Sequence, residues 1–146
     1  MTTIAIIEDD TYIGGLLEES LLSFYETFRQ KGITPDISLP NTPVIRELDE
    51  SAALRIFYNI ISNAAKYSAG DFHVSLTLNG TITFSNAAPN LTPVTAAQLF
   101  NRFYTVESLN ESTGLGLAIA KHLTERLGGQ ITAAYQDGRL VITVTF

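Results

Sequence analysis

The spacing of apolar residues along the chain predicts several helices. Asp49 is a natural N-cap for a long helix, and Gly32 lies where a glycine commonly ends one. A pair of glycines at positions 128 and 129 closes the last helical stretch. The predicted helices cover Leu16–Lys31, the stretch from Asp49 to about Tyr67, about Thr95–Phe103, and about Thr113–Leu127.

Alternation of apolar and polar residues predicts two β-hairpins. Phe72–Leu78 and Thr81–Ser85 flank an Asn-Gly pair, and Gln130–Tyr135 and Arg139–Phe146 flank an Asp-Gly pair. Both dipeptides favour a type I′ turn. Shorter β-type runs lie at Thr2–Ile7, Asp36–Leu39 and Val44–Leu48. The pattern predicts an α+β fold, a two-layer sandwich whose mixed, mostly antiparallel sheet is covered on one face by about three helices.

Length and composition indicate one globular domain. The chain has 146 residues, of which 45% are hydrophobic and 16% charged, and domains cluster at about 100–150 residues. The chain contains no cysteine, which excludes disulfides and thiolate metal sites. Its longest apolar runs are too short to span a bilayer and no signal peptide opens it. We therefore expect a cytoplasmic chain without direct membrane contact, although its parent protein could be membrane-anchored.

The net charge of −6 is unevenly distributed. Residues 1–50 carry a net charge of −7, whereas residues 51–146 carry +1. An acidic chain lacks the basic surface that nucleic-acid binding requires, so we expect no nucleic-acid partner. Any anion-binding chemistry is expected in the second part of the chain.

A pair of glycines opens the last predicted helix directly after a polar loop, in the segment Thr113-Gly114-Leu115-Gly116-Leu117. Glycine lets backbone N–H groups approach an anion closely, and the N–H groups of a first helical turn lack intrahelical partners. The segment is therefore a candidate phosphate-binding site. An ordinary helix start, in which the glycines only allow tight packing, explains the same residues.

Asn59, Asn63 and Lys66 share one face of the long predicted helix, beside its apolar stripe. Amide side chains on a largely apolar helix need partners, which backbone groups, water or a hydrated metal can supply. Mg²⁺ suits an amide oxygen together with phosphate oxygens and retained waters. The alternative, which the residues alone favour for Asn59, is that the amides anchor adjacent loops.

Three motifs together resemble the catalytic ATP-binding domain of sensor histidine kinases, which belongs to a group shared with DNA gyrase and heat-shock chaperone ATPases. In chain order they are Asn63-Ala64-x-Lys66-Tyr67, Leu99-Phe100-x-Arg102-Phe103-Tyr104 and Thr113-Gly114-Leu115-Gly116-Leu117-x-Ile119-x-Lys121. The resemblance covers residues 16–146 and is far more specific than any single motif.

The resemblance implies a role for each motif. Asn63 would coordinate Mg²⁺ that bridges the ATP phosphates, Phe100 and Phe103 would flank the base of an ATP lid over Thr105–Ser112, and Asn86 would accept a bond from the adenine amino group. The implied nucleotide-binding residues are Asn59, Asn63, Lys66, Tyr67, Asn86, Phe103, Thr113, Gly114, Leu115, Gly116 and Leu117. The implied reaction donates the γ-phosphate of ATP to a histidine on a dimerisation domain that this chain lacks, in a system with a response regulator.

One departure from the family pattern concerns the residues that would bind the adenine base. The family usually has an Asp followed by spaced glycines where this chain has Asn86-Ala87-Ala88-Pro89. A neutral amide is a weaker acceptor than a carboxylate, so we expect weaker nucleotide binding. A nucleotide-free protein-interaction module on the same fold therefore stays an alternative.

A second departure concerns the phosphate acceptor. Neither His73 nor His122 is followed by an acidic residue or lies in a helical hairpin. We therefore expect no autophosphorylation of the isolated chain. An anti-sigma-factor-like serine kinase also lacks such a hairpin and is a second alternative, which the aromatic motif at Leu99–Tyr104 disfavours.

Residues 1–15 are predicted to be an N-terminal extension. They resemble the opening of a receiver domain, whose first strand ends in an acidic pair, here within Glu8-Asp9-Asp10. The rest of a receiver domain has no room in this chain. The preferred interpretation is an acidic tail or an extra edge strand, and Asp9 and Asp10 are assigned no function.

Overall fold

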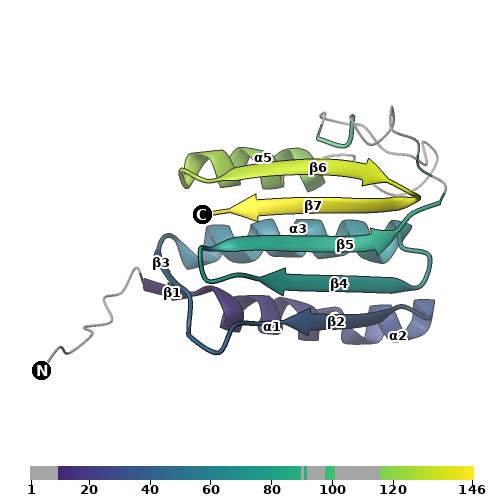
Figure 1. Cartoon of the computed structure of the whole chain (residues 1–146), viewed down its shortest axis with the longest axis horizontal. Coiled ribbons are helices and arrows are strands. Elements are labelled where there is room, and N and C mark those ends of the chain that lie inside the picture. Colours follow the sequence, from purple (N-terminus) through teal and green to yellow (C-terminus); the bar gives the residue numbers. More distant parts are fainter. Residues whose placement is uncertain (1–9, 90, 92–97, 101–115) are drawn as a thin grey trace, which may run out of the picture.

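A five-stranded sheet forms one layer of the structure, and helices pack on one of its faces (Figure 1). The computed structural model describes residues 10–89, 91, 98–100 and 116–146. The sheet consists of β2 (Thr34–Ser38), β4 (Asp71–Leu76), β5 (Thr81–Ala87), β6 (Gln130–Gln136) and β7 (Arg139–Thr145). Its order is β2-β4-β5-β7-β6, in which β2 runs parallel to β4 and the other pairs are antiparallel. The predicted fold class is confirmed.

The described helices lie behind the sheet in Figure 1. They are α1 (Ile13–Ser23), α2 (Tyr25–Lys31), α3 (Glu50–Tyr67) and α5 (Gly116–Arg126). The prediction of one helix over Leu16–Lys31 is wrong, because the chain leaves helical geometry at Phe24 (φ −104°, ψ 6°). The Phe24 ring packs 6.1 Å from the ring of Phe28 and 6.1 Å from that of Tyr58, so tertiary contacts accompany the break.

Helix α3 forms where the sequence predicts it. The Asp49 side chain accepts hydrogen bonds from the backbone N–H groups of Ser51 (2.9 Å) and Ala52 (3.3 Å), which confirms it as the N-cap. The helix ends at Tyr67, as predicted. Its buried face is apolar and turns toward the sheet; the buried residues are Ala53, Ile56, Phe57, Ile60, Ile61, Ala64 and Ala65.

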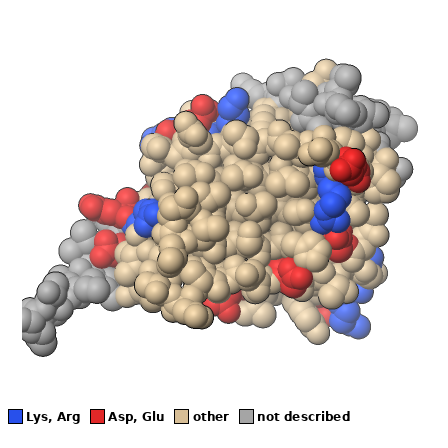
Figure 2. Space-filling model, viewed as in Figure 1, with Lys and Arg blue, Asp and Glu red and all other residues tan. Residues whose placement is uncertain are grey.

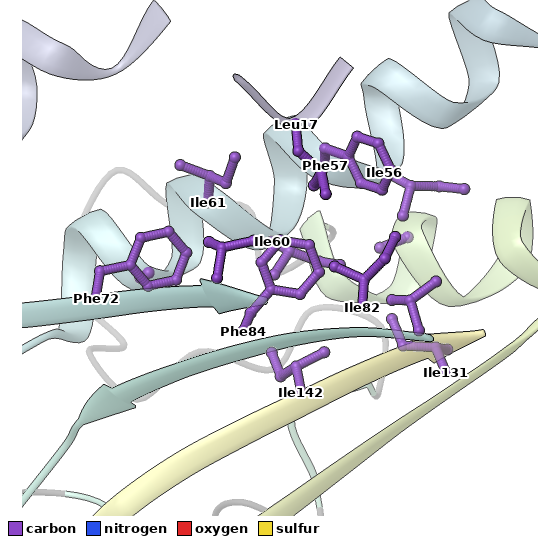
Figure 3. Close-up of a cluster of buried hydrophobic side chains, with 14 of the residues drawn as sticks. Leu17, Ile56, Phe57, Ile60, Ile61, Phe72, Ile82, Phe84, Ile131 and Ile142 are labelled. Atoms are coloured by element: carbon purple, nitrogen blue, oxygen red, sulfur yellow. The ribbon is translucent and has the colours of Figure 1, made fainter. Parts of the chain in front are cut away.

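Aromatic rings connect α3 to the centre of the sheet. The ring centroid of Phe84 lies 6.2 Å from that of Phe57 and 6.3 Å from that of Phe72. Figure 3 shows these rings among the isoleucines of α3 and of the strands. All three phenylalanines are buried, so this cluster contributes a central contact between the two layers.

The two hairpins use different turns. Asp137 (φ 54°) and Gly138 (φ 75°) both have positive φ, which confirms the predicted type I′ turn between β6 and β7. The prediction of a type I′ turn at Asn79-Gly80 is wrong, since positive φ is found only at Gly80 (86°) in that loop. The Gly80 N–H bonds the Thr77 carbonyl (3.0 Å) and the Thr77 N–H bonds the Thr81 carbonyl (3.0 Å). This is the three-residue loop that ends in a left-handed glycine.

The described part of the N-terminal segment packs on the fold. Strand β1 (Asp10–Tyr12) pairs antiparallel with β3 (Ile45–Glu47) in a separate two-stranded sheet. The Thr11 hydroxyl donates to the Leu48 carbonyl (3.1 Å), and Ile13 is 1% exposed. Helix α1 thus runs through the predicted boundary between residues 15 and 16. Residues 1–9 lie outside the described residues, and the resemblance of Met1–Gly15 to a receiver domain stays a prediction.

Most of the predicted helix at Thr95–Phe103 lies outside the described residues. Residues 98–100, which are described, form a turn. Among the helices of the described ranges, none has the length and apolar character that crossing a membrane requires.

We expect Phe84→Ala to lower the free energy of unfolding by about 3–5 kcal/mol, because it leaves a cavity between α3 and the sheet. Urea unfolding followed by circular dichroism measures the change. Thr83→Ala is the matched control, since Thr83 lies on the opposite face of β5, and it should cost about 1 kcal/mol or less. Equal losses for the two variants would contradict the assignment of Phe84 to the central contact.

Candidate nucleotide-binding site

The described members of the predicted site lie on α3, β5 and α5. The end of α3 is joined to the end of β5 by a hydrogen bond from the Ala69 N–H to the Ala87 carbonyl (2.9 Å). Helix α5 packs along α3. In Figure 1, α3 and β5 both end at the same side of the molecule. The fold therefore brings together motifs that lie far apart in the sequence.

Asn59 lies against the start of α5. A Cβ atom on Gly116 would be 3.9 Å from the Asn59 Oδ1, which places the amide beside the second glycine of the predicted phosphate-binding segment. The Asn59 Nδ2 is buried and has no hydrogen-bond partner among the described residues. Leaving a buried donor unpaired costs about 1–3 kcal/mol. Among the described residues no loop is anchored by this atom, and the role of Asn59 stays a prediction.

Asn63 and Lys66 follow on the same helix. Asn63 is one helical turn beyond Asn59, is half-buried, and its side chain makes no hydrogen bond within the described ranges. Lys66 is exposed in the last turn. Tyr67, the last residue of the helix, is half-buried. An amide oxygen and an ammonium group are thus presented from adjacent turns of α3, as the sequence predicts.

Asn86 lies near the end of β5, on the strand face that is turned toward the helices. It is 3% exposed, and its Nδ2 donates to the Ala87 carbonyl (3.1 Å). No described residue donates to its Oδ1. The amide is therefore held in an orientation that leaves its oxygen as an acceptor.

Part of the predicted site lies outside the described residues. These residues are Phe103, Thr113, Gly114 and Leu115, together with the predicted lid Thr105–Ser112. Of the neighbouring residues, Leu117 is 5% exposed and its side chain belongs to the core, so only its backbone could face a ligand. Phe100 is half-buried, with the Lys121 Nζ 5.9 Å from its ring centroid.

A polar network that the sequence did not predict lies beside the end of β5. Arg139 donates to the Asp71 Oδ2 (2.8 Å) and to the Ser85 hydroxyl (2.9 Å). His73 contacts the Asp36 Oδ2 through Nδ1 (2.8 Å) and the Asp71 Oδ2 through Nε2 (3.1 Å). Figure 2 shows that the open face of the sheet is otherwise largely uncharged, with charged side chains at its margins. In the sequence, His73 lacks the context of a phosphate acceptor, and no motif points to Asp71.

The network shifts the protonation of two of its members. The hydrogen bond to Asp36 is the main cause that raises the pKa of His73 above its usual value of 6.5, and Asp71 adds to it. Partial burial alone would raise the pKa of Asp71, but the N–H of Ala87 and the guanidinium of Arg139 together lower it below 3.8. The network therefore favours the protonated form of His73 and the ionised form of Asp71 more than water does.

We expect His73 to titrate above pH 6.5 in the folded chain, and Asp36→Asn to lower that pKa, as measured by NMR of the ring protons. Because folding raises this pKa, the stability it contributes is complete below the unfolded value and is lost as the pH rises through the folded value. Glu26→Gln is the control, since Glu26 pairs with Arg29 elsewhere on the surface. A pKa that Asp36→Asn leaves unchanged would show that the Asp36 contact is not formed in solution.

Comparison with known proteins supports the family that the motifs suggest. A family model described as "Histidine kinase-, DNA gyrase B-, and HSP90-like ATPase" matches residues 48–146. The sensor histidine kinase YcbM of Bacillus subtilis (strain 168) is 32% identical over 144 residues, which cover 92% of this chain and 46% of YcbM. This chain thus spans less than half the length of that relative.

Solved structures show the same fold. The mycobacterial sensor histidine kinase MprB superposes with a TM-score of 0.78 at 23% identity, over 94% of this chain and 95% of that one. Full-length ShkA in complex with AMPPNP superposes with a TM-score of 0.75 at 24% identity, over 97% of this chain and 32% of that one. The chain belongs to the histidine kinase-, DNA gyrase B- and HSP90-like ATPase family, and the relatives that it matches are sensor histidine kinases.

Proposed function

We propose that this chain binds Mg-ATP and serves as the catalytic domain of a two-component sensor histidine kinase. It would donate the γ-phosphate to a histidine on a dimerisation domain outside this chain, and a response regulator would then receive the phosphate. The observation that carries the proposal is the side-chain amide of Asn59, which lies beside Gly116. The Nδ2 of this amide is buried and has no hydrogen-bond partner among the described residues.

A polyphosphate fits the surroundings of Asn59. An unpaired buried donor is rare in native structures and points to a missing partner. Its neighbour Gly116 is the first residue of α5, so backbone N–H groups of the first turn are close to the same place. Amide and backbone donors together bind phosphate oxygens without a basic patch, which agrees with the near-neutral charge of residues 51–146.

Asn63 is the residue that would hold Mg²⁺. Among the described residues, no group of three or more His, Cys, Asp or Glu side chains could hold a metal ion. The ion would therefore be bound by the Asn63 amide oxygen, by phosphate oxygens and by water, a ligand set that Mg²⁺ accepts. When bound, Mg²⁺ neutralises charge on the phosphates, and Lys66 supplies a further positive charge from the next turn.

The base would be recognised by Asn86. Its Oδ1 accepts from no described residue, and an adenine amino group is a donor. A neutral acceptor gives a weaker bond than the carboxylate that is usual at this position. The structure of full-length ShkA is a complex with AMPPNP, an ATP analogue, which supports a nucleotide as the ligand of this fold.

The chain's contribution to the reaction would be positioning. Phosphoryl transfer depends mainly on alignment and on stabilisation of charge at the phosphate oxygens. Asn59, the start of α5 and Lys66 can hold and orient the phosphates. The acceptor would come from another domain, since both ring nitrogens of His73 are engaged by carboxylates.

We expect Asn63→Ala to weaken Mg-ATP binding at least about tenfold, because it removes the protein's metal ligand. Isothermal titration calorimetry at constant Mg²⁺ measures the change. Asn41→Ala, in the exposed loop between β2 and β3, should bind as the wild type does. Unchanged affinity in Asn63→Ala, or no binding by the wild type at millimolar nucleotide, would refute the proposal.

We expect the isolated chain not to phosphorylate itself on histidine. His73 is held between Asp36 and Asp71, and His122 is exposed on α5. Incubation with labelled Mg-ATP followed by acid and base treatment tests this. Acid-labile label retained on this chain would contradict the expectation, and His73→Gln and His122→Gln would identify its position.

A further inference from the structure

We propose that Asp71 is a positioning residue for the nucleotide, because its carboxylate fixes the backbone of Ala87 and, through it, the amide of Asn86. The inference rests on the proposed function, in which Asn86 accepts a bond from the adenine amino group. Asp71 itself would not touch the nucleotide.

Ala87 is the link between the two side chains. Its N–H donates to the Asp71 Oδ1 at 2.7 Å, a short bond of the charge-assisted kind. Its carbonyl accepts from the Ala69 N–H (2.9 Å) and from the Asn86 Nδ2 (3.1 Å). The plane of this carbonyl sets the orientation of the Asn86 amide, and Asp71 holds the same residue from its N–H side.

Asp71 is itself oriented by two basic side chains. Its Oδ2 accepts from Arg139 (2.8 Å) and from His73 (3.1 Å), which leaves Oδ1 to Ala87. The same contacts from Ala87 and Arg139 lower its pKa, so the acceptor is ionised at neutral pH. Oδ2 therefore fixes the orientation of the carboxylate, and Oδ1 binds the backbone of Ala87.

The neighbouring residue Ala88 does not depend on Asp71. The Ala88 N–H bonds the Gly138 carbonyl (2.8 Å), and the Ala88 carbonyl accepts from the Tyr135 hydroxyl (2.7 Å). Loss of Asp71 would thus remove the bond at the Ala87 N–H, while Ala88 stays held and the pairing of Asn86 and Ala87 with β7 remains. The Asp71 side chain is 32% exposed and lies outside the hydrophobic core. Its removal should therefore disturb the end of β5 around Ala87 more than the fold as a whole.

The test compares the affinities of Asp71→Ala and Asp71→Asn for adenosine and for Mg-ATP, measured by calorimetry or NMR. Both variants remove the negative charge, but only Asn keeps an oxygen that can accept the Ala87 N–H. We expect Asp71→Ala to raise both dissociation constants about tenfold, and Asp71→Asn to raise them about threefold or less. Asp36→Ala is the matched control, because it removes another carboxylate of the network that does not contact Ala87, and its affinity should equal that of the wild type.

A second readout is the chemical shift of the backbone amides, and its wild-type arm does not depend on the stability of any variant. In the wild type, adenosine should shift the amide resonances of both Asn86 and Ala87, and in Asp71→Ala the Ala87 amide proton should move upfield even without ligand. Failure of the wild type to bind would remove the proposed function and this inference with it.

Three results would overturn only the inference. The first is wild-type affinity in Asp71→Ala. The second is an equal loss in Asp71→Asn and Asp71→Ala, which would point to charge alone. The third is an equal loss in Asp36→Ala, which would point to the network as a whole. Should Asp71→Ala fail to fold, an unshifted Ala87 amide in the adenosine-bound wild type would overturn it as well.

Discussion

The packing of α3 on the sheet is the contact on which the rest of the structure depends. Phe57 meets Phe84 across the two layers at 6.2 Å, and this fixes the rotation of the helix about its axis. Because each helical residue adds about 100°, burial of Phe57 and Ile60 also fixes where Asn59 and Asn63 point. The core therefore orients the candidate site, and a rotation that moved the amides would expose the phenylalanine.

In strand β5, packing also fixes which side chains face the helices, because alternate residues of a strand point to the same face. Ile82 and Phe84 face the helices, so Asn86 faces them as well. A buried amide at the end of an apolar row needs a partner, and the Ala87 carbonyl satisfies only its donor. The amide oxygen accepts from no described residue, and the proposed function assigns this oxygen to the adenine amino group.

The charge distribution agrees with a site built from amides and backbone groups. The acidic excess belongs to residues 1–50, whereas the amides, Lys66 and the start of α5 lie in the near-neutral remainder. Acidity argues against a nucleic-acid partner but does not oppose a phosphate that is held by N–H groups and a metal. The charged network of Asp71, His73 and Arg139 occupies the open face of the sheet, where it supports β5 from the other side.

The features that the sequence by itself determined depend on interactions between residues that are close in the chain. The Asp49 cap, the left-handed Asp137-Gly138 turn and the extent of α3 depend on residues close in the chain, and the motifs that identify the family are equally local. The pairing of β1 with β3 depends on tertiary contacts, and the break at Phe24 is accompanied by one, to Tyr58. The bonds of Asp71 depend on strand register, since they join residues as distant in sequence as 71 and 139. Only the tertiary structure decided these features, because no local preference encodes which strands become neighbours.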